Sequence, residues 1–111
     1  MKVLYVAGPY RAKGDHYVWE NILSARSVAR QAWLKGWAVI CPHANTFLMD
    51  GPDINPEQFL AGDLEFIERC DAVLMLPRWE QSVGATGEKK HAECLAIPVY
   101  YSIDELPEGK R

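Results

Sequence analysis

The chain has 111 residues, 49% of them hydrophobic, and a formal net charge of −3. A chain of this length forms one domain with a modest core, so we expect a single domain over residues 1–111. The slightly acidic balance gives no support to a nucleic-acid polymer as partner, and the apolar runs are too short to cross a membrane.

The start of the chain and its cysteines predict a cytoplasmic protein. Met1 and Lys2 lead straight into an apolar run, which is not the pattern of a signal peptide. The three cysteines are widely spaced and form no C-x-x-C pattern, so we expect reduced thiols. The histidines have no ligand spacing relative to them, and we therefore expect no bound metal and no cofactor.

Short apolar runs alternate with longer amphipathic segments along the chain. The runs predict strands over residues 2–7, 37–41, 71–76 and 98–101. The first run is almost continuously apolar, as expected of a parallel strand covered on both faces. The first amphipathic segment has apolar residues at three- and four-residue steps: Val18, Ile22, Ala25, Ala29, Ala32 and Trp33.

The amphipathic segments predict helices over residues 17–35, 55–69 and 84–96. Asn55 and Pro56 form a good pair of cap and first helical residue for the second of them. The connection over residues 42–53 is long for a compact domain, and such connections often bind ligands. A short capped turn is expected over residues 102–105, followed by a frayed tail over residues 107–111.

This alternation of strands and helices predicts an α/β three-layer sandwich with a flavodoxin-like, or Rossmann-like, parallel sheet. The favoured strand order is 2-1-3-4, so the switch point lies between the first and third strands. Ligands of such folds bind outside the carboxyl ends of the strands at this point. Those ends are residues 8–11 and 77–82.

Residues 82–88 carry the most unusual pattern, a serine- and glycine-containing turn that ends at Glu88. We expect Glu88 in the first turn of a helix, where the helix dipole favours an ionised carboxylate. Such a carboxylate could act on a small ligand, or it could be an ordinary solvated glutamate. The residues alone support both interpretations equally.

Asp63 is the second anomaly, because it shares a predicted helical face with apolar residues. An ionised carboxylate is unfavourable there unless it is paired. A structural aspartate bonded to a backbone group, or to an arginine at the edge of the stripe, explains the position as well. Together, a partly desolvated Asp63 and an ionised Glu88 form the pair of carboxylates that glycosidic cleavage requires.

Three motifs resemble those of the nucleoside 2-deoxyribosyltransferase-like superfamily, including its small nucleoside 5′-monophosphate N-glycosidases. They are Tyr5-Val6-Ala7-Gly8-Pro9-Tyr10-Arg11, Gly62-Asp63-Leu64-Glu65-Phe66-Ile67 with the following Cys70-Asp71-Ala72-Val73, and Ser82-x-Gly84 with Glu88 four residues later. The resemblance covers nearly the whole chain, and the third motif is the most specific.

The resemblance implies cleavage of the N-glycosidic bond of a (2-deoxy)nucleoside or its 5′-monophosphate, with release of the base to water or transfer of the sugar. Glu88 matches the nucleophile that forms a covalent sugar–enzyme intermediate. Asp63 matches an acid near the sugar and base, and Tyr5 matches a phenol that positions the nucleophile. The resemblance also implies a homodimer or higher homo-oligomer.

The predicted substrate-binding residues come from the same motifs and from two aromatic side chains. Gly8 and Arg11 match sugar or phosphate contacts, and Ser82 matches a phosphate-binding serine. We propose Trp79 as a stacking wall for the base, while His43 either lines the base pocket or caps a strand end. The neighbouring motif residues Pro9, Tyr10 and Gly84 complete the predicted set.

The chain departs from the superfamily pattern in two ways. Pro9 replaces a small hydroxyl residue of the monophosphate hydrolases, and no asparagine after Tyr101 matches the one of the transferases. A nucleotide-binding or sensing module without turnover is the alternative function. A phosphatase is disfavoured, because no cysteine or aspartate nucleophile follows the first strand and no P-loop lysine is present.

Overall fold

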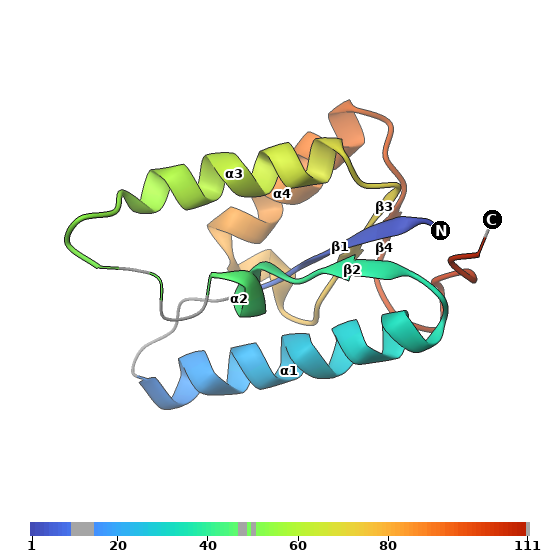
Figure 1. Ribbon diagram of the computed structural model, residues 1–111, viewed down its shortest axis with the longest axis horizontal. Helices are drawn as coiled ribbons and strands as arrows, with labels where there is room; N and C mark the ends of the chain where they lie inside the picture. Colours follow the sequence, from blue (N-terminus) through green and yellow to red (C-terminus); the bar gives the residue numbers. More distant parts are fainter. Residues whose placement is uncertain (10–14, 47–48, 50, 111) are drawn as a thin grey trace.

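The computed structural model describes residues 1–9, 15–46, 49 and 51–110. Its centre is a parallel four-stranded sheet in the order β2-β1-β3-β4, which confirms the predicted topology (Figure 1). The strands are β1 (Val3–Ala7), β2 (Ala38–Ile40), β3 (Ala72–Met75) and β4 (Val99–Tyr100). The switch point therefore lies between β1 and β3, as expected.

Helices cover both faces of the sheet, so the predicted three-layer, flavodoxin-like α/β sandwich is confirmed. Helix α1 (Asp15–Leu34) lies on one face, and helices α3 (Pro56–Glu68) and α4 (Val83–Cys94) lie on the other (Figure 1). The Asn55 side chain accepts a hydrogen bond from the Glu57 N–H at 3.0 Å, as predicted for the start of α3. No described helix is long and apolar enough to span a membrane.

Two short helical segments were not predicted. Helix α2 (Pro42–Asn45) follows β2 directly, in the connection that we expected to be a loop. Its proline occupies the first helical position, where the missing N–H carries no penalty. The 3-10 turn η1 (Trp79–Gln81) separates β3 from α4. Both segments lie after carboxyl ends of strands, so they shape the edge where the site was expected.

Alternate residues of β1 point into two different cores. Leu4 and Val6 pack with the apolar face of α1, while Tyr5 and Ala7 pack under α3 and α4. The strand is buried on both faces from Leu4 to Ala7, which explains its continuous apolar sequence. Tyr5 therefore reaches the α3/α4 side from the middle of the sheet.

One residue of the predicted apolar face of α1 does not point to the core. Trp33 is 52% exposed, whereas Ile22, Ala25, Ala29 and Ala32 are buried. The prediction for Trp33 is wrong, because Trp33 lies at the edge of the buried face, about 40° around the helix from Ala29 and about 100° from Ala32.

The tail is not frayed over residues 107–110, which corrects the prediction. The Gly109 carbonyl accepts a hydrogen bond from the Lys2 N–H at 2.9 Å, and the Gly109 N–H donates to the Lys35 carbonyl at 3.0 Å. The Trp37 Nε1–H donates to the Pro107 carbonyl at 2.8 Å. A Cβ at Gly109 would lie 2.6 Å from the Trp37 ring, so the close approach requires glycine.

Candidate active site

A phenol and a carboxylate meet between the sheet and helix α4. The Tyr5 O–H donates a hydrogen bond to the Glu88 carboxylate. Tyr5 is completely buried, and Glu88 lies on the same side of α4 as the buried Ala85 and Ala92. Residues that are 83 positions apart in the chain are thus brought together by the packing of α4 against β1 and β3.

The start of α4 places Glu88 deeper in the helix than predicted. Ser82 is the N-cap, and its hydroxyl accepts a hydrogen bond from the Ala85 N–H at 3.1 Å. The helix begins at Val83, so Glu88 lies in its second turn rather than its first. The prediction started the helix at Gly84, where Glu88 would be the fifth helical residue, whereas the serine cap makes it the sixth.

The environment of Glu88 favours its neutral form more than the sequence predicted. Burial raises the pKa of Glu88 to about 7; the hydrogen bond from Tyr5 opposes this rise, and the charge of Asp63 adds to it. The expectation of a carboxylate kept ionised by the helix dipole is therefore wrong, because the dipole acts within the first turn and burial dominates beyond it.

Asp63 belongs to the same electrostatic cluster. Burial raises the pKa of Asp63 to about 6, in agreement with its predicted position on an apolar stripe of α3. Its charge also acts on Glu88 and on Tyr5. Burial, followed by the charges of these two carboxylates, raises the pKa of Tyr5, so the phenol remains a neutral hydrogen-bond donor. We call Tyr5, Asp63 and Glu88 the acid cluster.

The end of β1 packs tightly against the end of β3. The Leu76 N–H donates to the Ala7 carbonyl at 2.7 Å, and a Cβ at Gly8 would lie 2.6 Å from the Leu76 side chain. Gly8 is therefore needed for close packing, whatever contact it makes with a substrate. Tyr10 and Arg11, two predicted binding residues, lie outside the described residues.

His43 fastens α2 to the end of β1. It is 4% exposed, and its ring Nε2 lies 2.7 Å from the Pro9 carbonyl oxygen. Burial lowers the pKa of His43, so the ring is neutral and its Nε2–H donates to that carbonyl. Of the two predicted roles, the structure contains this cap on the strand end. A contact with the base stays a prediction.

Two other predicted binding residues flank the start of α4. The ring of Trp79 lies 5.9 Å from that of Tyr101, with the Lys89 Nζ 5.4 Å from its centroid. Trp79 is thus packed within its own chain, and stacking on a base stays a prediction. Gly84 is exposed, and an added Cβ there would touch only the Ser82 Oγ at 3.8 Å.

Arg78 is the residue at this edge to which the sequence analysis gave no role. It has a left-handed backbone with φ of 65°, just after β3, and its guanidinium donates to Asn21 Oδ1 at 3.2 Å. This conformation costs about 1–2 kcal/mol for a residue with a side chain, and strained residues cluster at functional sites. The signal in the sequence was its position directly after a proline that ends the strand.

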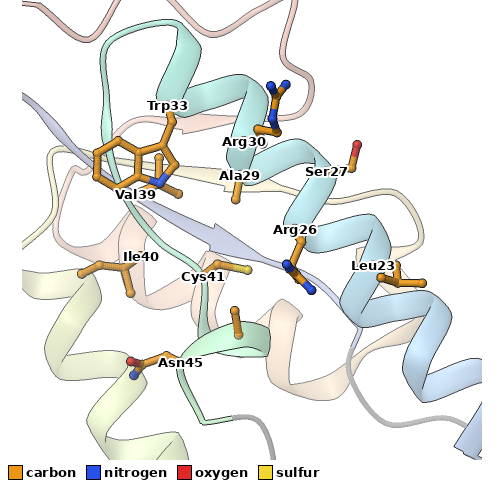
Figure 2. Close-up of a pocket in the computed structure, with 11 residues that line it drawn as sticks. Leu23, Arg26, Ser27, Ala29, Arg30, Trp33, Val39, Ile40, Cys41 and Asn45 are labelled. Carbon is orange, nitrogen blue, oxygen red and sulfur yellow. The ribbon is translucent and has the colours of Figure 1, made fainter.

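A hollow in the described structure lies away from these residues. It has a volume of about 900 Å³ and is lined by α1, β2 and α2, not by the acid cluster (Figure 2). Within the described residues, no group of three histidine, cysteine, aspartate or glutamate side chains could hold a metal ion. We place the candidate active site at the acid cluster, because perturbed carboxylates beside a switch point are the stronger chemical signal.

The fold is similar to that of a known enzyme. A 2-deoxyribosyltransferase from the psychrotolerant bacterium Bacillus psychrosaccharolyticus, described as a biocatalyst for nucleoside synthesis, matches with a TM-score of 0.61. The match covers 87% of this chain and 69% of that chain, at 20% sequence identity. At this identity the likeness shows a shared fold. A comparison with curated proteins finds no match.

A family model provides the closer classification. The model for DUF4406, a domain of unknown function, matches residues 2–101, which include both strands of the switch point and the whole acid cluster. The chain therefore belongs to the DUF4406 family.

Proposed function

We propose that this protein cleaves the N-glycosidic bond of a (2-deoxy)nucleoside or its 5′-monophosphate through a covalent sugar intermediate on Glu88. The observation that carries the proposal is the hydrogen bond from Tyr5 to Glu88, with the Asp63 carboxyl close enough to shift the pKa of both. Two carboxyl groups with different environments can divide the roles of nucleophile and acid.

In the first step, a Glu88 carboxylate oxygen attacks the anomeric carbon of the sugar. The bond from this carbon to the base nitrogen breaks, and its electron pair leaves with the base. Asp63, with a pKa of about 6, supplies the proton that the departing base takes up. The Tyr5 phenol holds the attacking carboxylate in place through its hydrogen bond.

In the second step, an acceptor attacks the anomeric carbon and releases Glu88. Asp63 takes a proton from the acceptor as the bond between sugar and carboxylate oxygen breaks. Water as acceptor gives hydrolysis, and a second base gives transfer of the sugar. The superfamily resemblance and the shared fold with a 2-deoxyribosyltransferase support both outcomes.

The groups around the switch point support a phosphorylated substrate. The Ser82 hydroxyl accepts from the Ala85 N–H, and its own hydrogen can still be donated to a ligand oxygen. Arg78 places a cation at the carboxyl end of β3. We therefore favour the 5′-monophosphate over the nucleoside as substrate. On the superfamily resemblance, we also propose a homodimer as the working assembly.

A nucleotide-binding module without turnover is the second candidate. The observation that favours it is the pKa of Glu88, about 7, because a protonated carboxyl group is not a nucleophile. The module and the enzyme would bind the same small molecules, but only the enzyme would release free base.

The test is incubation of the purified protein with a panel of nucleosides, 2-deoxynucleosides and their 5′-monophosphates. Release of free base is followed by chromatography, and a sugar adduct on Glu88 is sought by mass spectrometry after acid quenching. We expect base release from at least one deoxynucleotide and none with Glu88→Gln. Binding of a nucleotide without base release would favour the sensing module and contradict the enzyme.

A further inference from the structure

The hollow on the α1 side is a candidate surface for a different activity. It is bounded by α1, by strand β2 at the edge of the sheet and by α2 (Figure 2). The acid cluster lies on the other face of the sheet, where Tyr5 packs under α3 and α4, and none of its members lines the hollow. A binding function of the hollow is therefore independent of the proposed cleavage reaction.

The side chains around the hollow have the composition of a binding surface. Leu23 and Trp33 are 54% and 52% exposed, and Arg26 and Arg30 project from the same helix (Figure 2). Tryptophan and arginine are the residues most enriched at the energetic centres of protein interfaces. None of the eleven described residues that line the hollow is acidic, although the chain as a whole carries a charge of −3.

Strand β2 offers backbone groups to the hollow. Its one neighbour in the described sheet is β1, and the Ala38 N–H donates to the Lys2 carbonyl at 2.9 Å. Because alternate residues of a parallel strand bond to the same side, Ala38 and Ile40 face β1, while the N–H and C=O of Val39 face outward. Val39 lines the hollow, so this outer edge is open to an extended chain.

The spacing of the arginines matches that of an extended peptide. Arg26 and Arg30 are four residues apart in α1, about 6 Å along the helix axis. Side chains on one face of a β-strand repeat about every 6.8 Å. Two acidic residues separated by one other residue would therefore each meet one arginine, while the opposite face of the same strand stays free for apolar side chains.

We propose that the hollow binds an extended acidic segment of another protein as an added strand beside β2. The segment forms backbone hydrogen bonds with Val39, places alternate carboxylates at Arg26 and Arg30, and packs the apolar side chains of its other face beside Ile40, which also lines the hollow. This mode combines the general affinity of strand addition with specificity from charge.

Charge favours this occupant over a second copy of the chain. In a twofold contact the same surface lies on both sides, so the arginines of one hollow would approach those of the other. No carboxylate among the lining residues that the structure describes offsets this repulsion. An acidic partner segment pairs its carboxylates with the arginines and avoids this repulsion.

The test uses a short fluorescent peptide of alternating glutamate and valine as probe, with a lysine–valine peptide of equal length as control. Binding is measured by fluorescence anisotropy at physiological salt. We expect binding of the glutamate peptide alone, weakened at least about tenfold by Arg26→Ala with Arg30→Ala. Arg69→Ala is the matched control, because Arg69 is an exposed arginine of α3 on the other face, 3.5 Å from Glu65.

Two further arms separate strand addition from simple charge attraction. Charge reversal, Arg26→Glu with Arg30→Glu, should transfer binding to the lysine peptide. Methylation of alternate backbone nitrogens of the glutamate peptide should abolish binding, because it removes the donors that pair with Val39. Failure of either arm overturns the strand-addition mode.

Absence of binding by the glutamate peptide overturns the proposal, as does equal binding of the lysine peptide. Analytical ultracentrifugation of the wild type tests whether a second copy of the chain occupies the hollow instead. A dimer that Trp33→Glu dissociates would show that a second copy occupies the hollow, and it would refute the acidic partner.

Discussion

The two faces of the sheet bury different kinds of side chain. On the α1 side the core is apolar, with a row of alanines from α1 packed on Leu4, Val6 and Trp37. On the α3/α4 side the core includes the Tyr5 phenol, with the Glu88 carboxyl bonded to it. The apolar core on the α1 side thus stabilises the fold, and its charged arginines lie at the exposed hollow. The α3/α4 side instead buries ionisable groups, which is unfavourable for stability.

This difference indicates where function limits stability. Burial alone would favour an apolar residue at the position of Glu88, because the pKa shift measures the free energy that the charged form loses in the folded protein. Among the described residues, the buried members of the α1-side core include no carboxylate. Substitutions on the two faces should therefore have opposite effects on activity and on stability.

The largest effect is expected from Glu88→Gln. The substitution keeps the size of the side chain but removes the carboxylate nucleophile, so base release should fall at least about a thousandfold. The melting temperature should be unchanged or higher, because the amide carries no charge to desolvate. Arg26→Ala, on the other face, is the control and should leave base release unchanged. Retention of most activity by the glutamine variant would end the assignment of the nucleophile.

Asp63→Asn should lower turnover on the order of a hundredfold, the typical contribution of one general acid. Its stability should equal or exceed that of the wild type, since burial disfavours the charged form of Asp63. Steady-state kinetics and a thermal melt measure the two effects separately. A large fall in melting temperature would identify Asp63 as a structural residue instead.

The acid cluster also predicts a dependence of stability on pH. The folded-state pKa of Asp63 and Glu88 lies above the unfolded value, so the folded protein binds more protons between about pH 4 and 7. The free energy of unfolding should therefore be highest below this range and fall as pH rises through it, by up to about 3 kcal/mol for Glu88. Denaturant titrations of wild type and Glu88→Gln measure this slope, which the variant should reduce.

The pH dependence of the activity should be set by the same two carboxyl groups, Asp63 and Glu88. Cleavage requires Glu88 ionised and Asp63 protonated, so kcat/KM should pass through a maximum between about pH 6 and 7. A profile that keeps rising above pH 8 would contradict the role of Asp63 as the acid.

Two glycine substitutions test which close contacts stabilise the fold. Gly109→Ala should destabilise the protein by about 1–3 kcal/mol, because its Cβ would lie 2.6 Å from Trp37. Gly87→Ala is the matched control: it is exposed in α4 with nothing within 4 Å of the added Cβ, and it should stabilise the protein by up to about 1 kcal/mol. Denaturant unfolding measures both, and an unchanged Gly109→Ala would contradict the docked tail.

The sequence was sufficient for the fold because the fold depends on local patterns. Continuous apolar runs identified β1 and β3, and Asn55 marked the start of α3 through a contact two residues away. The features that it missed depend on distant partners. The tail is held by Lys2, Lys35 and Trp37, which no local pattern in the tail reveals.

In the candidate site, too, the sequence predicted the features with a local signal and missed those that depend on distant residues. Asp63 was found because one carboxylate interrupted an apolar stripe, which is a local signal. The raised pKa of Glu88 was missed, since it follows from burial against a strand 83 residues away. The strained backbone of Arg78 was also missed, because a left-handed conformation of an arginine is imposed by the surrounding turn and its contact with Asn21.

The smallest expected effect concerns the choice between a nucleoside and its 5′-monophosphate. Arg11 follows β1 in the sequence, and Arg78 follows β3 with its guanidinium at Asn21, so each of the two arginines is a candidate phosphate ligand. A guanidinium contact with phosphate is worth roughly 1.5–3 kcal/mol, a preference of about tenfold to a hundredfold. We expect the wild type to have the higher kcat/KM for the monophosphate.

Single substitutions Arg11→Ala and Arg78→Ala, measured with a deoxynucleoside and its 5′-monophosphate, assign this preference. Substitution of the arginine that binds phosphate should lower kcat/KM for the monophosphate alone, because the unphosphorylated nucleoside has no phosphate to contact it. Arg69→Ala, an exposed arginine paired with Glu65 on α3, is the control. A wild type that prefers the nucleoside would exclude a phosphate site at the switch point. A ratio that survives both substitutions would instead place phosphate binding on Ser82 and the backbone N–H groups at the start of α4.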